Sequence, residues 1–395
     1  MKKIIFALAL ALALAAATAA VHAAPYIPAN GQQVIETLPR RGDPVQQELR
    51  RLRSELNAKP QDLALATGVA RRYIAMSRSE TDPRYLGYAQ AALAPWWWLS
   101  APPPEVRLLR ATLLQSTHQF NAALDDLKAV LAIEPNNAQA WLTLATVQTV
   151  QGDYAGATAS CAHVSSLSIE LVTVSCLANV ATVTGRSASA ERLLDLTLER
   201  SSNAPADLQV WALTLMAEMA ERRGDVVVAE TRYRRALALS PRDSYLQGAY
   251  ADFLLQQKRP EEVLVLLKDQ SRIDALLLRQ ALALQQQGGQ RQALAADIKE
   301  LAARFDAAML RGDTVHQREQ ARFELTLRHD PATALTLARK NWDVQKEPAD
   351  VRIYLDAAMQ ARDTRAAKPA LDWIARNHSE DVTALRLAHQ LSTGT

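Results

Sequence analysis

The sequence is poor in aromatic residues, glycine and cysteine. Aromatic side chains make up 5% of its 395 residues, and it contains 13 glycines and two cysteines. Alanine and leucine are abundant, whereas runs of β-branched residues are scarce, which is the balance of an all-helical protein. The chain is long enough for several domain cores or for one long array.

Common catalytic and metal-binding motifs are also missing. The sequence has no phosphate-cradling GxxxxGK, no GxSxG elbow and no HExxH. No two histidines pair at helical spacing, and Cys161 and His163, two residues apart, fall on different faces of a helix, so no metal site is expected. Adjacent carboxylates such as Asp125 and Asp126 are expected on solvated helix surfaces. The sequence therefore predicts no cofactor and no enzyme.

No charge of one sign dominates. The chain has 45 Lys and Arg against 42 Asp and Glu, a formal net charge of +3. Lys2 and Lys3 lie in a segment that we expect to be removed, so the mature chain is close to neutral. Neither a nucleic-acid footprint nor a polybasic membrane patch is predicted.

Residues 1–24 have the pattern of a secretory signal peptide. Lys2 and Lys3 precede an apolar run, and small residues offer a cleavage site after Ala23 or Ala24. An uncleaved signal anchor is the alternative, because the apolar run approaches membrane-spanning length. No other long apolar segment follows, so we expect no stable membrane insertion after cleavage. The short two-lysine start is similar to bacterial export signals and indicates a periplasmic or secreted protein of a Gram-negative-like cell.

A pattern of 33 to 34 residues recurs between Pro104 and Pro241. Its clearest copy consists of Trp141, Leu144, Ala145, Gln148, Gly152, Tyr154, Ala157 and Cys161. The copy before it supplies Ala111, Phe120, Ala123, Leu127, Val130 and Pro135. A later copy supplies Leu213, Met216, Ala217, Gly224, Ala229, Tyr233, Ala236 and Pro241. This pattern resembles the tetratricopeptide repeat, a helix-turn-helix unit of about 34 residues.

The physical reason for the pattern lies in how two antiparallel helices pack. Small residues allow the helices to cross closely, and bulky residues fill the space beside the crossing. Gly152, Gly185 and Gly224 fall where the first helix must turn, and we expect them to adopt positive φ. Pro135 and Pro241 should end the second helices of their units.

The resemblance implies an all-α fold, a right-handed superhelical α-solenoid of about nine stacked antiparallel helix pairs. The predicted order is a signal peptide (1–24), an extended leader (25–42), N-terminal helices with a degenerate repeat (43–103), a regular array (104–270), and degenerate C-terminal repeats with a capping helix (271–395). In the last part, residues 290–310 predict an overlong helix, and residues 381–391 predict a final helix whose outer face is polar.

The resemblance also implies a non-catalytic scaffold whose first helices line a concave groove for a protein or peptide partner. The positions that the family uses for binding are here Thr112, Gln139, Thr146, Asn179, Trp211, Glu218, Tyr245 and Asp252. Such a groove would be largely neutral, with Trp211 and Tyr245 as apolar anchors. Chaperone-binding members carry lysines where this chain has Leu108, Leu142 and Ser175, which argues against a clamp for a terminal carboxylate.

The two cysteines, Cys161 and Cys176, are predicted to lie on neighbouring antiparallel helices. The turn between these helices centres near Ser168, about two helical turns from each cysteine, so the two cysteines should be at equal height. In an oxidising compartment this favours a disulfide. The alternative is a pair of reduced, buried cysteines that act as small apolar residues.

Three consecutive tryptophans, Trp96, Trp97 and Trp98, interrupt the repeat pattern. They could form a surface platform for a sugar or a peptide, because on a helix they would point three ways at once. They could instead fill the junction between the first repeat and the regular array.

Three functions are therefore compatible with the sequence. The first is an exported scaffold that binds a partner protein or an extended peptide segment in envelope assembly or secretion. The second is an accessory protein of polysaccharide synthesis or export, for which exposed tryptophans would be the signature. The third is an enzyme or metal protein built on a solenoid, which would need converging carboxylates or histidines. The partner's identity and the oligomeric state stay open.

Overall fold

The computed structural model describes Asn30 and residues 43–313 and 315–393. The expected signal peptide lies outside the described residues, as does the expected leader except for Asn30. Residues 1–51 and 52–395 form two compact units, and each is described by itself. Helix α2 (Pro44–Ala58), which begins in the first unit and ends in the second, starts directly after Asp43, whose carboxylate accepts the backbone N–H of Val45 at 2.8 Å.

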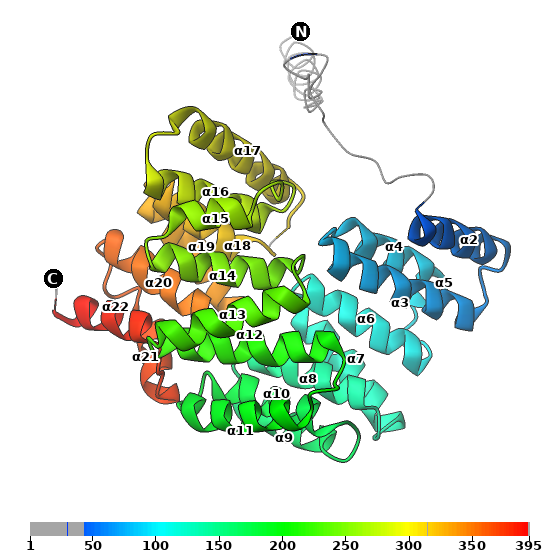
Figure 1. Ribbon diagram of the computed structural model, residues 1–395. Coiled ribbons are helices and arrows are strands. Elements are labelled where there is room, and N and C mark those ends of the chain that lie inside the picture. The colour runs from blue at the N-terminus through cyan, green and yellow to red at the C-terminus, as the bar shows by residue number, and fades with distance from the viewer. Residues whose placement is uncertain (1–29, 31–42, 314, 394–395) are drawn as a thin grey trace, which may run out of the picture. The chain divides into compact units, whose positions relative to one another are not determined.

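All regular elements of the described residues are α-helices (Figure 1). In the second unit, nine antiparallel hairpins follow one another, which confirms the predicted solenoid of helix pairs. They are α3 (Leu63–Glu80) with α4 (Arg84–Ala92), α6 (Pro104–Ser116) with α7 (Phe120–Ile133), α8 (Ala138–Gln151) with α9 (Tyr154–Val164), α10 (Glu170–Ala181) with α11 (Ser187–Arg200), α12 (Ala206–Arg222) with α13 (Val226–Leu239), α14 (Ser244–Gln256) with α15 (Pro260–Leu266), α16 (Asp274–Gln287) with α17 (Arg291–Leu310), α18 (Gln317–Thr326) with α19 (Pro331–Val344), and α20 (Pro348–Gln360) with α21 (Lys368–Asn377). The short α5 (Ala94–Trp97) and the last helix, α22 (Val382–Thr393), stand outside these pairs.

The hairpin turns follow from local backbone chemistry. Gly152, Gly185 and Gly224 adopt φ of 87°, 68° and 81°, which confirms the expected left-handed turn positions. Asp153 and Asp225 come next and cap the second helices of their hairpins, because their carboxylates accept backbone N–H groups three residues on, at 2.9 and 3.4 Å. Side-chain caps and glycine turns together set where each hairpin bends.

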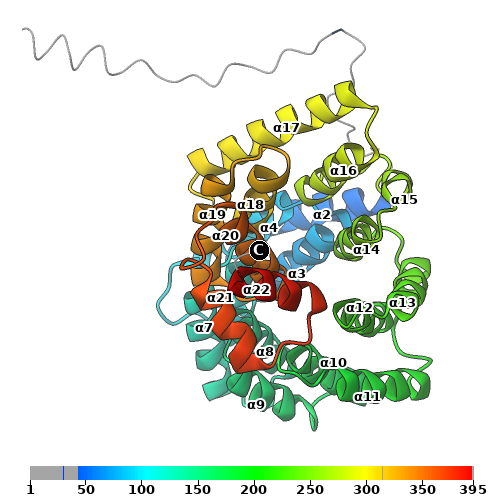
Figure 2. The same cartoon turned by 90° about the vertical axis from the view of Figure 1, so that its left-hand side faces the viewer.

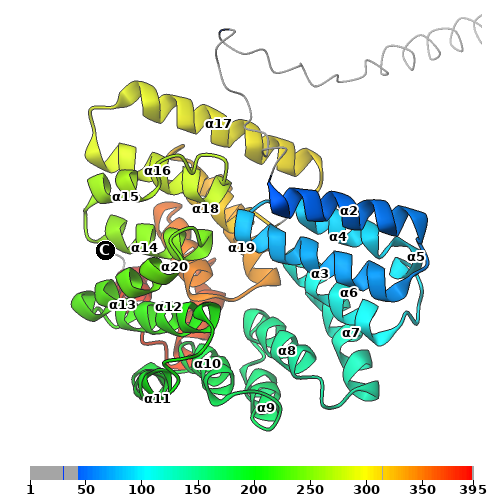
Figure 3. The same ribbon diagram turned by 45° about the vertical axis from the view of Figure 1, so that its right-hand side comes forward.

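The hairpins stack in chain order, as Figure 3 shows from α10 and α11 up to α16 and α17. The row is curved. In Figure 2 the first helices α8, α10, α12 and α14 lie on its inner side, and the second helices α9, α11, α13 and α15 lie on its outer side. The first helices therefore present one face toward the inside of the curve, as the resemblance implies.

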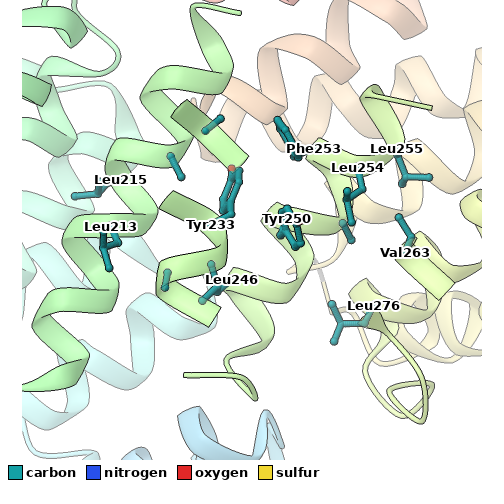
Figure 4. Packing of buried hydrophobic residues seen from close by; sticks show 14 of the residues in the cluster. Leu213, Leu215, Tyr233, Leu246, Tyr250, Phe253, Leu254, Leu255, Val263 and Leu276 are labelled. Carbon is teal, nitrogen blue, oxygen red and sulfur yellow. The ribbon is translucent and has the colours of Figure 1, made fainter. Parts of the chain in front are cut away.

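A continuous apolar core joins the middle hairpins (Figure 4). Its centre is Tyr233, which is fully buried, with its ring centroid 5.5 Å from that of Tyr250 and 5.7 Å from that of Phe253. These rings come from α13 and α14, so they join two consecutive repeats. A single hairpin could not bury them, which is why neighbouring hairpins must stack.

Two expectations for the C-terminal part have different outcomes. The overlong helix is confirmed, since α17 has 20 residues. The prediction of a polar outer face for the last helix is wrong in part, because α22 exposes Val382 and Leu385 at 46% and 41%. Its other face packs on α20 and α21, with Leu387 and Leu391 buried.

Cys161 and Cys176 form a disulfide, with their Cα atoms 5.6 Å apart. It links α9 to α10 and closes a loop of 15 residues. In the chain-entropy model such a loop contributes about 3 kcal/mol to the free energy of unfolding.

Reduction of this disulfide is therefore expected to lower the free energy of unfolding by about 3 kcal/mol. Chemical denaturation followed by circular dichroism, with and without dithiothreitol, measures the loss. The double variant Cys161→Ala and Cys176→Ala is the control and should not respond to the reductant. An unchanged midpoint for the reduced parent chain would show that the bond contributes no stability.

No helix among the described residues is long and apolar enough to cross a membrane.

Candidate functional site

The predicted groove residues lie on the first helices α6, α8, α10, α12 and α14, and most are half-buried. Two of them are exposed, Gln139 and, at 66%, Tyr245. The hydroxyls of Thr112 and Thr146 donate to carbonyls of their own helices, Leu108 and Leu142, at 3.0 and 2.9 Å. Because their protons are donated within the helix, these two hydroxyls can only accept hydrogen bonds from a partner.

Glu218 and Tyr245 connect two neighbouring repeats. The phenol of Tyr245 donates to Oε1 of Glu218 at 2.6 Å, and Oε2 of Glu218 lies 2.8 Å from Arg222. Arg222 also donates to the hydroxyl of Thr182 on the preceding repeat. The negative charge of Glu218 raises the pKa of the Tyr245 phenol, so it stays a donor at neutral pH. The anchor Tyr245 is thus held in place before any partner arrives.

Asp252 is already occupied by the chain itself. Its carboxylate pairs with Arg279 at 2.5 Å and with Arg322, on α18, at 2.6 Å. Burial alone would raise the pKa of Asp252, but these two guanidinium groups outweigh it and lower the pKa. A distant helix of the same chain therefore already supplies a counter-charge for this predicted groove residue.

Asn179 and Trp211 complete the predicted set. The amide of Asn179 makes no hydrogen bond within the described residues, although the side chain is half-buried. Trp211 is also half-buried and packs on the apolar cluster around the disulfide. Asn179 occupies the same repeat position as Asp252, whose carboxylate meets α18 across the curve, so Asn179 faces the same side. An unpaired, half-buried amide can both donate to and accept from the backbone of a bound segment.

A second surface was not anticipated from the sequence. We define the turn edge as the turns between the two helices of four consecutive hairpins, at Gly152, Gly185, Gly224 and Lys258. We define the C-terminal segment as residues 346–393. A Cβ on each of the three glycines would lie near this segment: 3.1 Å from Lys346 at the first, 2.8 Å from His378 at the second and 3.7 Å from Val382 at the third.

Polar contacts hold the C-terminal segment on the array. The backbone N–H of Lys346 donates to the carbonyl of Val150 at 2.7 Å, and the indole of Trp373 donates to the phenol of Tyr154 at 2.8 Å. The carboxylate of Glu380 accepts the backbone N–H of Ser187 at 2.8 Å. This last contact caps α11, whose own N-cap residue, Arg186, has no side-chain cap.

Arg352 links the segment to a buried acid of the array. Its guanidinium lies 2.7 Å from Asp381 and 3.4 Å from Glu221. Glu221 also accepts hydrogen bonds from Tyr233 and Gln256, both at 2.8 Å. Burial raises the pKa of the Glu221 carboxyl, although Arg352 and Tyr233 oppose that change. The segment therefore supplies the counter-charge for this acid.

Replacing Gly185 by alanine is expected to destabilise the docked segment. The methyl group would meet Cβ of His378 at 2.8 Å and its carbonyl oxygen at 2.9 Å, on top of the cost of positive φ. Gly224→Ala is the matched control, since it has the same turn geometry and an ordinary 3.7 Å contact. Hydrogen exchange should show faster exchange of residues 373–393 in Gly185→Ala than in Gly224→Ala. Equal exchange would mean that the close approach does not matter.

A cavity of about 550 Å³ lies at the fourth position of the turn edge. It is bounded by the ends of α12, α14, α16 and α18 and by the beginning of α22. Its lining residues are Glu221, Gly224, Val226, Asp252, Phe253, Leu255, Gln256, Gln257, Lys258, Leu282, Gln285, Gln286, Arg322, Thr326, Val382, Thr383 and Arg386. Its volume is within the range of binding pockets.

The three tryptophans have different environments. Trp97 is buried at 8%, Trp96 is half-buried and Trp98 is exposed at 86%. Trp97 and Trp98 line a shallow hollow of about 220 Å³ beside Gly87 and Ala91. The stretch thus fills the junction with Trp97 and leaves Trp98 outside, so a platform of all three residues is not formed.

The contacts of the C-terminal segment could not be read from helical periodicity, but one signal was present. Gly152 and Gly224 are followed by a capping aspartate, whereas Gly185 is followed by Arg186. The backbone N–H of Ser187 at this start finds its acceptor in Glu380. Other helices, such as α7 and α15, also begin without a side-chain cap, so a missing cap alone does not identify a distant partner. No group of three or more histidine, cysteine, aspartate or glutamate residues in the described ranges could hold a metal ion.

Comparisons with known proteins agree with the repeat pattern. Residues 114–166 match the family model described as tetratricopeptide repeat. No curated protein matches the chain.

Several solved structures are similar to the chain in fold. The human IFIT1 dimer with m7Gppp-AAAA is 13% identical, with 88% of this chain and 86% of that chain covered and a TM-score of 0.46. Cut9-Hcn1 of the APC/C is 13% identical, with coverages of 80% and 59% and a TM-score of 0.44. Yeast Tom70 is 12% identical, with coverages of 89% and 92% and a TM-score of 0.30. Together, the repeating residues, the nine hairpins and the match over residues 114–166 show a solenoid of stacked helix pairs whose regular part is similar to the tetratricopeptide repeat.

Proposed function

We propose that this protein is a non-catalytic, exported scaffold that binds an extended segment of a partner protein along the inner face of α8, α10, α12 and α14, in envelope assembly or secretion. The fold is that of a scaffold for protein or peptide binding. Support for export comes from the signal-like residues 1–24, and support for a peptide ligand comes from the neutral, hydrogen-bonding side chains of the inner face.

The observation that carries the proposal is the pair Tyr245 and Asn179. Tyr245 exposes 66% of its surface while its phenol is fixed on Glu218, so its ring is an immobilised apolar anchor. Asn179 has an amide without a partner in the described part of the chain. An anchor for a side chain together with an amide for a backbone is the combination that holds an extended peptide.

A pull-down from envelope extract tests this function. The parent chain is compared with the variant Trp211→Ala, Tyr245→Ala and Asn179→Ala. The control variant carries Leu193→Ala, Leu196→Ala and Val227→Ala, which are exposed at 47%, 54% and 76% on α11 and α13. We expect parent and control to retain the same protein and the inner-face variant to retain about tenfold less or none. Equal retention by the inner-face variant, with an unchanged circular dichroism spectrum, would contradict the proposal.

A second function is favoured by Trp98 alone. Its indole is exposed at 86% beside a shallow hollow, a geometry that suits stacking on a sugar ring. An accessory protein of polysaccharide synthesis or export would use such a residue. Quenching of tryptophan fluorescence by envelope oligosaccharides, lost in Trp98→Ala and kept in Trp211→Ala, would support it. No quenching would remove this candidate.

A further inference from the structure

The turn edge carries the C-terminal segment at its first three positions and an open cavity at its fourth. At Gly152 and Gly185 the absence of a side chain allows the segment to approach closely, and at Gly224 the segment lies at an ordinary van der Waals distance. The fourth position is Lys258, which is exposed and lines the cavity. The surface that holds the chain's own segment therefore continues to a place that this segment leaves open.

The chain itself shows what kind of group this edge accepts. Glu380 places its carboxylate on the turn at Gly185 and accepts the backbone N–H of Ser187 at 2.8 Å. The C-terminal segment thus places an acidic side chain at the second of the four positions of the turn edge, two positions before Lys258. At the fourth position the corresponding residue is Pro260, which has no backbone N–H, so an acidic group there would depend on side-chain cations.

The charges around the cavity favour an acidic ligand. Both acids that line it are neutralised by the chain, Glu221 by Arg352 and Asp252 by Arg279 and Arg322.

The cations at the cavity are not neutralised in the same way. Lys258 and Arg386 line it and are exposed, and neither has a carboxylate oxygen within 4.0 Å among the described residues. Arg386 stands in the second turn of α22, where a cation gains nothing from the helix dipole. The cavity therefore has two cations whose charge is left for a ligand.

The walls add an apolar component and a hydrogen-bonding group. Val226 and Val382 are exposed at 37% and 46%. The half-buried amide of Gln257 makes no side-chain hydrogen bond within the described residues. A ligand that matches this lining has carboxylates, at least one aliphatic side chain and a polar backbone, which is the composition of an acidic peptide segment.

We infer that the cavity at Lys258 binds an acidic segment of another polypeptide, whose Asp or Glu side chains pair with Lys258 and Arg386 while an aliphatic side chain lies between Val226 and Val382. This inference rests on the proposed scaffold function and adds the chemistry of a second contact, outside the inner face. The bound acidic peptide would therefore lie on the turn edge beyond the part that the C-terminal segment already occupies.

Fluorescence anisotropy with two matched peptide pools tests the inference on the full purified chain. The probes are labelled octapeptides in which Leu, Ile and Val alternate with Asp and Glu, and the same peptides with Asn and Gln in the acidic positions. We expect the acidic pool to bind at least about tenfold more tightly than the amide pool, and we expect higher salt to weaken that binding. We also expect Lys258→Gln with Arg386→Gln to remove the preference. The control Lys299→Gln with Arg311→Gln removes two exposed charges, one on α17 and one at its C-cap, and should keep the preference.

Three results would overturn the inference: equal binding of both pools, an equal loss in the control variant, or full competition by N-acetylglutamate at similar concentrations, which would indicate a site for a small acid. The inner-face variant Trp211→Ala, Tyr245→Ala and Asn179→Ala separates the two proposals. If the cavity is wrong, that variant still loses its partner from envelope extract. If the inner face is wrong, it still binds the acidic pool.

Discussion

Replacing Tyr233 by alanine is expected to lower the free energy of unfolding by about 3–5 kcal/mol. The side chain is fully buried between α13 and α14, where its ring contacts those of Tyr250 and Phe253. Truncation leaves a cavity between two repeats, and it also removes a hydrogen-bond donor to the buried Glu221. Urea denaturation followed by circular dichroism measures the loss.

Tyr233→Phe separates the two contributions. It keeps the ring and removes only the hydroxyl, so Glu221 retains Gln256 and Arg352 as partners. The expected cost is about 1 kcal/mol. If the phenylalanine variant lost as much stability as the alanine variant, the hydrogen bond, and not the packing between the repeats, would be the dominant contribution.

The second large effect is expected for Asp350→Ala, which should lower the free energy of unfolding by about 3 kcal/mol. Asp350 is 1% exposed and accepts hydrogen bonds from Asn341 at 2.8 Å, Gln345 at 3.2 Å and the backbone N–H of Glu347 at 2.7 Å. Alanine would leave two buried amides without an acceptor and remove the reciprocal cap of α20. Thermal unfolding measures the change. A loss below about 1 kcal/mol would show that water or another group replaces the carboxylate.

Asp350 also predicts how stability depends on pH. Burial raises the pKa of its carboxyl to about 6, although Arg318 opposes the shift, whereas in the unfolded chain it titrates near its ordinary value of about 3.9. Between these values the folded chain binds more protons, so stability falls as the pH rises through that range. We expect the melting temperature to rise as the pH is lowered from about 7.5 to about 5, and we expect Asp350→Asn to flatten that rise. A steeper rise in the variant would contradict the assignment.

The repeat pattern predicted the fold because each hairpin is specified by nearby residues. Small residues such as Ala145 and Ala157 are fully or almost fully buried at the helix crossings, and the three turn glycines have the expected positive φ. The prediction that Cys161 and Cys176 lie opposite each other on neighbouring antiparallel helices also followed from counting residues along each helix. These features depend on helical geometry within one or two units, which the sequence displays directly.

The contacts of the C-terminal segment depend on a different quantity, the curvature of the whole array. Tyr154 meets Trp373, 219 residues away, and Asp252 meets Arg322, 70 residues away. A small rotation at each repeat adds up along the row and decides which distant helices meet. No local sequence pattern reports this accumulated rotation. The ion pair of Asp252 with Arg322 and the contacts of the turn edge with residues 346–393 could therefore not be predicted.

The most direct test of the scaffold function is a site-specific cross-link in the cell that produces the protein. A photoreactive benzoylphenylalanine is introduced at Tyr245 on α14, a helix of the inner side (Figure 2), and, in a second strain, at Val227 on α13, a helix of the outer side, where the side chain is exposed at 76%. After irradiation, mass spectrometry identifies what is joined to each position. The scaffold function predicts a defined protein adduct at Tyr245 that is absent at Val227. Adducts at Val227 with none at Tyr245 would contradict it and would place the partner on the outer face.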